Sequence, residues 1–294
     1  MMNNTISINR IMRDFRSTKN THLESNNIYT HLDENNIYTV YSLHIGDNNT
    51  PYSGGFYLFQ WTFNNNYPFS PPTGKICTAG NYMRFHPNFY NERDNGRICL
   101  SILNTWAGPQ WTSVHTLESI LITVKSIMTE YPLQNEPGYE TDQSILSTKY
   151  NAIIRYNNYY IAVYKVLKYT PEPFRVFLPI MENYFITHFK QYYDDLLSLQ
   201  QYNNEIVRSS IYNLSEKLRY GQLLILFREL YDNLCDKHNI VSELYDPNNK
   251  KNNRKIYPIL KACFRDVDHI HTYLDRKFIV YRDKRGYKRW RLVQ

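Results

Sequence analysis

Cysteines are few and long hydrophobic runs are absent from this 294-residue sequence. The four cysteines lie far apart and form no C-x-x-C pair: Cys77, Cys99, Cys235 and Cys263. Their spacing excludes the common zinc patterns and gives no disulfide framework, so we expect reduced thiols and a cytoplasmic or nuclear location. No apolar run approaches the ~20 residues that span a bilayer. The N-terminal stretch MMNNTISINRIMRDFRS lacks the apolar centre of a signal peptide, so neither membrane insertion nor secretion is expected.

Positive charge is concentrated at one end of the chain. The formal net charge is +7, but residues 250–294 carry 14 Lys and Arg against 4 Asp and Glu, which leaves 20 basic and 23 acidic residues elsewhere. The net positive charge therefore belongs to residues 250–294 and not to the rest of the chain. The stretch YRDKRGYKRWRL could bind nucleic acid or an acidic partner. No nucleic-acid motif accompanies it, and we favour a solvated basic end that packs on the preceding helices.

The first half of the chain alternates between helical and extended patterns. Four apolar residues recur at helical spacing near the N-terminus: Ile8, Ile11, Met12 and Phe15. They predict an amphipathic helix over residues 6–17, with Arg10 and Arg13 on its exposed side. The segments NIYTHLDE, YTVYSLHIGD and GFYLFQWTF follow, and the turn signals PYSGG and YPFSPPTG flank the third. Short strands joined by such turns predict an antiparallel meander.

Beyond Cys99 the period becomes helical. Apolar residues from Leu117 to Met128 follow Thr116, a good N-cap, and Pro132 is expected to end this helix. Further helical patterns cover about 141–167 and, past the TPEP break, much of the chain to about residue 237. We therefore predict an α/β (α+β) core over 1–167, a mainly helical extension over 168–245, and a polar linker with the basic tail over 246–294.

Cys99 lies in an unusual polar and aromatic segment, RFHPNFYNERDNGRICLSILNTWAGPQWTS, whereas the other cysteines lie in apolar patterns typical of packing. The motifs YPFSPP, HPN, GRICLSIL and TLESILITVKSIMTEYPLQNEPGYE occur in the order found in ubiquitin-conjugating enzymes. The chain resembles that family from about residue 6 to 167. The runs HPNFYNERDNGRICLSILNTWAGPQW and SIMTEYPLQNEPG are similar to its Z-type branch, whose members carry a C-terminal extension.

This resemblance implies a ubiquitin-conjugating fold with an N-terminal helix, a four-stranded antiparallel meander and further helices. It also implies an acyltransferase that accepts activated ubiquitin on Cys99 as a thioester and passes it to a substrate lysine. The expected partners are ubiquitin, an activating enzyme, the substrate and in many cases a ligase, with no membrane or nucleic acid. No metal or cofactor is implied, because ATP is consumed by the activating enzyme upstream.

The residue types suit this chemistry. A thiolate is a good nucleophile and thiols leave readily, so exchange between two thioesters needs no strong base. Attack by a lysine is harder, because an amine with a pKa of ~10.4 must lose its proton. In the family pattern Asn88 matches an amide that donates to the developing oxyanion, although it could only brace the loop bearing Cys99. Glu136 aligns with a carboxylate beside the acceptor lysine, and its alternative is a solvated loop residue.

Two departures from the family pattern concern the same region. The insert NERDNG between HPN and Cys99 is longer than in many relatives, which puts the placement of Asn88 in doubt. Phe85 stands where many members have Tyr.

Candidate partner-binding residues come from three segments. Arg10 and Arg13 match the basic face that relatives present to an activating enzyme, and Phe69 matches an aromatic inserted into ligase grooves. Ser113 and Val114 lie where ligase-binding members often have Ser-Pro-Ala, which puts ordinary RING-type ligase binding in doubt. A solvated or core role is the alternative for each of these residues.

Three other functions remain open at this point. The chain could conjugate a ubiquitin-like modifier, or it could be a non-catalytic ubiquitin-binding variant, although such variants lack the cysteine that is present here. A cysteine protease is disfavoured because no protease signature surrounds Cys99.

Overall fold

The computed structural model describes residues 2–20, 22–78, 80, 82–238, 240, 270–273, 276–282 and 288–292. The chain divides into two compact units, residues 1–185 with 205–218 and residues 186–204 with 219–294. The predicted core boundary at residue 167 lies inside α4 (Val166–Lys168) of the first unit and stays a prediction.

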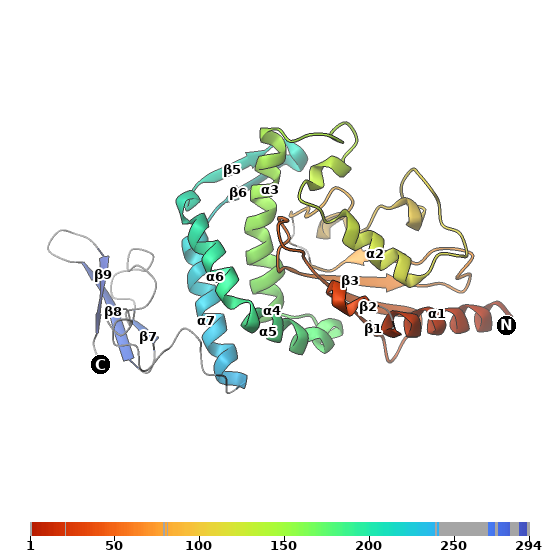
Figure 1. Ribbon diagram of the computed structural model, residues 1–294, viewed down its shortest axis with the longest axis horizontal. Helices are drawn as coiled ribbons and strands as arrows, with labels where there is room; N and C mark the ends of the chain where they lie inside the picture. The colour runs from red at the N-terminus through yellow and green to blue at the C-terminus, as the bar shows by residue number, and fades with distance from the viewer. Residues whose placement is uncertain are drawn as a thin grey trace. The chain divides into compact units, whose positions relative to one another are not determined.

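The first unit begins with helix α1 (Met2–Asn20) and a four-stranded sheet (Figure 1). The strands pair in chain order and all neighbours are antiparallel: β1 (Ile28–Leu32), β2 (Thr39–Ile45), β3 (Phe56–Thr62) and β4 (Thr73–Ile76). The N-terminal helix and the meander are thus confirmed.

The central strands β2 and β3 are buried on both faces of the sheet. Their sequences are therefore more apolar than those of strands with one face in solvent. Phe59 and Trp61 belong to the same core cluster as Val124 of α2. On the alternate positions of β2 and β3, Tyr41 meets Phe174 at 5.1 Å and Phe56 meets Tyr184 at 6.0 Å between ring centroids. The helical segments after residue 170 therefore cover part of the sheet.

Helix α2 (Leu117–Ile127) begins at Thr116, as predicted. Thr116 and Ser119 form a capping box, in which each side chain bonds the other's backbone N–H. Pro132 does not end the helix: α2 stops at Ile127, and Pro132 instead begins a short 3₁₀ turn to Asn135. Proline fits the first turn of a helix because its missing N–H would have no partner there.

A long helical stretch follows, from α3 (Ile145–Asn157) through the π-helix η5 (Asn158–Lys165) into α4. The π segment begins at a residue tied to the sheet. Tyr57 of β3 donates from its hydroxyl to Asn158 Oδ1 at 2.7 Å, and Asn158 Nδ2 donates to the carbonyl of Ser53 at 2.8 Å. Irregular helical turns of this kind are uncommon and recur near functional sites.

The extension is mainly helical, but an unpredicted hairpin interrupts it. Its helices and strands are α5 (Leu178–Thr187), α6 (Phe189–Ser198), β5 (Ile206–Ser209), β6 (Leu214–Lys217) and α7 (Tyr220–His238). Strands β5 and β6 pair antiparallel and belong to the first unit, beside α3 (Figure 1). The remaining short 3₁₀ segments are Glu24–Asn26, Glu92–Asp94, Ser101–Leu103, Glu172–Phe177, Leu199–Tyr202 and Ile211–Asn213.

In the second unit α6 and α7 pack through aromatic rings. Phe189 stacks on Tyr231 at 3.9 Å, and Tyr192 meets Phe227 edge-on at 5.8 Å. The same unit contains a three-stranded antiparallel sheet that the sequence did not predict: β7 (Ile270–Tyr273), β8 (Arg276–Arg282) and β9 (Lys288–Leu292). The predicted polar linker lies outside the described residues. Within the described part of the chain, no helix has the length and apolarity to cross a membrane.

Candidate functional site

Cys99 and Asn88 are held side by side by two hydrogen bonds. The Cys99 N–H donates to the carbonyl of Asn88 at 2.9 Å, and Asn88 Nδ2 donates back to the carbonyl of Cys99 at 2.6 Å. A bridge between Phe89 and Ile98 continues this pairing. The two predicted site residues therefore meet, on either side of the inserted loop.

The insert does not displace Asn88, because it folds back on the end of β4. Asn91 Oδ1 caps the short turn 92–94, and Ile76 N–H donates to the carbonyl of Gly96 at 2.8 Å. Gly96 has φ +65°, and a Cβ there would lie 2.3 Å from the carbonyl oxygen of Ile76. Only glycine fits this crossing. The extra residues thus form a closed loop, and the strand pairing next to Cys99 is retained.

The thiol of Cys99 is almost fully buried. Only 4% of the residue is exposed, so the sulfur is not openly reachable from solvent. It is nevertheless outside the core cluster that contains its neighbours Ile98 and Leu100. The adjoining residues 92–95 and 104–110 are exposed.

The other described thiols are poorer nucleophile candidates. Burial raises the pKa of Cys77 to about 11, and burial also raises the pKa of Cys235. Both shifts reduce the thiolate fraction near neutral pH. Cys77, Cys99 and Cys235 are all free of disulfides, and Cys263 lies outside the described residues.

His86 braces the turn that carries Asn88. The imidazole is fully buried, and its Nδ1 accepts the Asn88 N–H at 3.0 Å while Nε2 donates to the carbonyl of Ile127 at 3.0 Å. Burial lowers the pKa of His86 to about 3, so the ring is neutral. Asn88 Oδ1 is buried without a hydrogen-bond partner. Since Nδ2 carries two N–H groups and one is used on Cys99, the amide can brace the loop and still offer a donor.

Glu136 is not a free loop residue. It is half-buried, and its Oε2 accepts a hydrogen bond from the hydroxyl of Tyr212. Tyr212 lies in the turn between β5 and β6 of the extension, 76 positions away in sequence. Sequence reasoning missed Tyr212, because only the folded hairpin brings it to Glu136.

Arg84 joins Tyr212 to the Cys99 region. Its guanidinium lies 4.0 Å from the ring centroid of Tyr212 and 4.1 Å from that of Tyr90. The same guanidinium donates through Nη2 to the carbonyl of Pro87, the residue before Asn88. Cation–π contacts contribute about 0.5–2 kcal/mol each, more when desolvated. Arg84 was also missed, although its place two residues before HPN is a usable signal.

Arg10 is not on an exposed side of α1, contrary to the prediction. Its side chain is 12% exposed and pairs with Asp14 at 2.8 Å. It also donates to the carbonyls of Ser113 at 2.9 Å and His115 at 2.6 Å. The i, i+4 carboxylate and the two carbonyls satisfy the guanidinium internally. Arg13 does face solvent, with a side chain 71% exposed.

Two exposed apolar side chains lie on loops joined to this part of α1. Phe69 is 68% and Val114 is 81% exposed. Trp111 Nε1 donates to the carbonyl of Pro68 at 2.7 Å, which ties the Phe69 loop to the loop of Ser113 and Val114. The predicted partner residues are thus brought to one region by hydrogen bonds. Their role in binding stays a prediction.

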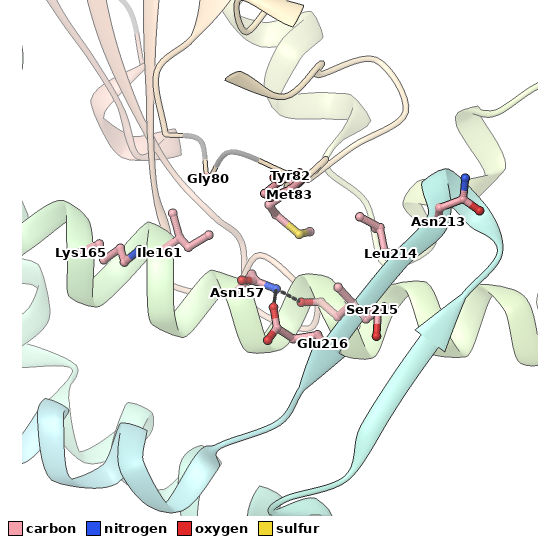
Figure 2. A pocket seen from close by; sticks show the side chains of 11 residues that line it. Gly80, Tyr82, Met83, Asn157, Ile161, Lys165, Asn213, Leu214, Ser215 and Glu216 are labelled. Atoms are coloured by element: carbon pink, nitrogen blue, oxygen red, sulfur yellow. Dashed lines mark hydrogen bonds between the residues drawn. The ribbon is translucent and has the colours of Figure 1, made fainter. Parts of the chain in front are cut away.

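A pocket of about 460 Å³ opens between α3, η5, β6 and the segment around Met83 (Figure 2). Met83, Ile161 and Leu214 supply apolar lining, and Asn157 Nδ2 donates to Glu216 Oε2 at 3.1 Å at its edge. Among the described residues, no group of three or more His, Cys, Asp or Glu side chains could hold a metal ion.

Comparisons with known proteins match the same part of the chain. The family model described as "Ubiquitin-conjugating enzyme" matches residues 10–157. The chain is 41% identical over 160 residues to "Ubiquitin-conjugating enzyme E2 Z" of Xenopus tropicalis and to that of Homo sapiens. Each match covers 53% of this chain. It covers 48% of the Xenopus tropicalis protein and 42% of the Homo sapiens protein. "Probable ubiquitin-conjugating enzyme protein 17" of Caenorhabditis elegans is 37% identical over 161 residues, covering 51% of this chain and 22% of the relative. The alignments thus span less than half of each relative's length.

Proposed function

Because the chain belongs to the ubiquitin-conjugating enzyme family, we propose that it carries activated ubiquitin as a thioester on Cys99 and transfers it to a substrate lysine. The similarity to the E2 Z proteins agrees with the branch that the motifs predicted. The observation that carries the proposal is the reciprocal pair of hydrogen bonds between Asn88 and Cys99. These bonds hold the Asn88 amide against the backbone of Cys99, which supports its use as a donor near the sulfur.

The first step is an exchange of thioesters. The Cys99 thiolate attacks the carbonyl carbon of the ubiquitin C-terminus, and the thiol of the activating enzyme leaves as thiolate. One C–S bond forms and one breaks, so the step is nearly balanced in energy. Because Cys99 is 4% exposed, the residues around its thiol must move before the donor thioester reaches it.

The second step forms an amide. An uncharged lysine amine attacks the thioester carbonyl, the C–N bond forms, and the C–S bond breaks to return the Cys99 thiolate. Asn88 Nδ2 uses its second N–H for the oxyanion, an effect typically of about 2.7–4 kcal/mol. Glu136 orients the incoming amine or accepts its proton, since the pKa of an amine lies ~3.4 units above pH 7.

The partners follow from the same proposal. The basic surface of α1 around Arg13 receives the activating enzyme, and the exposed Phe69 and Val114 offer a surface to a ligase. The chain itself needs no metal or cofactor, because the activating enzyme consumes the ATP. Free thiols suit a reducing compartment, either cytoplasm or nucleus.

The test is a charging assay with activating enzyme, ATP and ubiquitin. The wild-type chain should form an adduct that a thiol reductant removes, and Cys99→Ala should form none. Cys77→Ala is the matched control and should charge normally, because burial raises the pKa of that thiol. A Cys99→Ala chain that still formed a reductant-sensitive adduct would refute the proposal.

A further inference from the structure

The hairpin turn of the extension makes two separate contacts with the core, and both come from Tyr212. Its hydroxyl donates to Glu136, and its ring covers one face of the Arg84 guanidinium. All three residues belong to the first compact unit. The hairpin turn lies outside the ubiquitin-conjugating motifs. It nevertheless contacts Arg84, which precedes the HPN sequence, and Glu136, which follows it.

The backbone of Tyr212 is held in a conformation that large side chains avoid. Its φ is +54° and its ψ is +20°, in the left-handed region. Such a residue persists only where its surroundings determine its position, and outliers of this kind gather at functional sites. Here the surroundings are Glu136, Arg84 and the ring of Tyr150, whose centroid lies 5.8 Å from that of Tyr212. The strained turn therefore serves to present this one side chain.

The hydroxyl contact fixes the carboxylate. Oε2 of Glu136 is occupied by Tyr212, so the carboxylate has one defined orientation and its other oxygen, Oε1, is left for an incoming group. Charge-assisted hydrogen bonds of this type are short and directional. Burial also raises the pKa of Tyr212 well above the usual tyrosine value, and the hydrogen bond to Glu136 adds to this, so the hydroxyl stays a donor at working pH.

The ring contact acts on a different group. Arg84 lies between the rings of Tyr212 and Tyr90 and donates to the carbonyl of Pro87. Its own carbonyl accepts the Tyr150 hydroxyl at 2.8 Å. The residue after Pro87 is Asn88, which is bonded to Cys99 in both directions. A continuous set of contacts thus runs from the hairpin to the backbone of Cys99.

We propose that Tyr212 is a positioning residue for transfer to lysine: its hydroxyl aims the Glu136 carboxylate at the amine, while its ring steadies the turn that holds Asn88 and Cys99. This inference rests on the proposed function. It makes the hairpin of the extension part of the transfer apparatus, although the hairpin touches neither the sulfur nor the acyl group in the contacts described above.

The test separates the two roles by exchanging the nucleophile. The full chain is charged with ubiquitin, the activating enzyme is stopped, and loss of the thioester is followed with free lysine or with hydroxylamine. Hydroxylamine is uncharged at neutral pH and needs no carboxylate to deprotonate it. A defect in aiming Glu136 therefore slows lysine alone, whereas disorder around Cys99 changes the rate with both nucleophiles.

Tyr212→Phe removes only the hydroxyl and keeps the ring on Arg84. It should lower the maximal rate of discharge to lysine about tenfold, while charging and discharge to hydroxylamine stay within about twofold. In a Glu136→Gln background the same change should have little further effect, because the two side chains act as one unit. Tyr212→Leu removes the ring as well and should alter discharge to both nucleophiles.

Tyr82→Phe is the matched control. Tyr82 also stacks on an arginine, Arg93 at 3.8 Å, and accepts a hydrogen bond from it, but it contacts neither Arg84 nor Glu136 in the described contacts. It should discharge at the wild-type rate. Two results with a normally charged Tyr212→Phe chain would overturn the inference and leave the proposed function standing. One is discharge to lysine as fast as in the wild type, and the other is an equal slowing of discharge to lysine and to hydroxylamine. A wild-type chain that forms no thioester overturns the proposed function and this inference with it.

Discussion

Under the proposed function Asn88 has two tasks, and they use different hydrogens of its amide nitrogen. One N–H of Nδ2 donates to the carbonyl of Cys99, with Nδ2 2.6 Å from the oxygen. The second N–H is left for an oxyanion. Exchanging the oxygen and nitrogen of the amide would put two acceptors against each other at that contact, so the orientation is defined. The buried Oδ1 has no hydrogen-bond partner, which costs free energy in the folded state.

The Asn88→Ala variant separates the two tasks. Because the oxyanion develops more charge when an amine attacks, discharge to lysine should fall by about 100-fold and charging by less than about threefold. Single-turnover charging and discharge measured on the same preparation give both rates. Equal losses in the two steps would show that Asn88 only braces the loop.

At the scale of elements, α1 is joined to the loop before α2 by one side chain. Arg10 bonds Asp14 on its own helix and two carbonyls of that loop, and Asp14 also accepts the hydroxyl of Tyr67. The exposed Val114 sits between the two carbonyl acceptors, Ser113 and His115, in the sequence. The shape of the predicted ligase-facing loop therefore depends on a helix that is predicted to face the activating enzyme.

Arg10→Ala should lower the free energy of unfolding by about 2 kcal/mol, because the buried Asp14 carboxylate loses its partner at 2.8 Å and keeps only the Tyr67 hydroxyl and Arg13 at 3.9 Å. Arg13→Ala removes the same charge from an exposed position and should change stability by less than about 0.5 kcal/mol. Urea unfolding followed by tryptophan fluorescence measures both. Equal effects of the two substitutions would contradict the internal role of Arg10.

Local signals in the sequence were enough for some elements and not for others. The cap at Thr116 and the strands of the meander were predictable, because they depend on residues a few positions apart. The exposure of Arg10 was misjudged because its acceptors, Ser113 and His115, lie more than a hundred positions away. The contact of Tyr212 with Glu136 needs a hairpin whose strands are only four residues each. No periodic pattern marks strands that short.

For the molecule as a whole, two buried neutral histidines link stability to pH. His44 on β2 and His86 are both fully buried, and burial lowers the pKa of each to about 3; the charge of Lys125 adds to the shift at His44. In the unfolded chain both would titrate near ~6.5. Below that value the histidines of the unfolded state bind protons, whereas those of the folded state stay neutral. Stability is therefore lost as the pH falls from about 6.5 toward 3.

Between pH 7.5 and 5.0 each histidine should cost about 2 kcal/mol of stability, since one pKa unit corresponds to about 1.36 kcal/mol. Urea unfolding at the two pH values measures the sum for both residues. His44→Leu should reduce this pH dependence by about half whatever it does to stability at pH 7.5. An unchanged pH dependence in that variant would show that other groups cause the acid sensitivity.

The most direct test of the account is the chemical nature of the ubiquitin adduct when the sulfur of Cys99 is replaced by oxygen. After incubation with activating enzyme, ATP and ubiquitin, the wild-type adduct should disappear in thiol reductant. The Cys99→Ser adduct should survive reductant and disappear in alkali, as an oxygen ester does. A reductant-sensitive adduct on the Cys99→Ser chain would place the thioester on another cysteine and contradict the account.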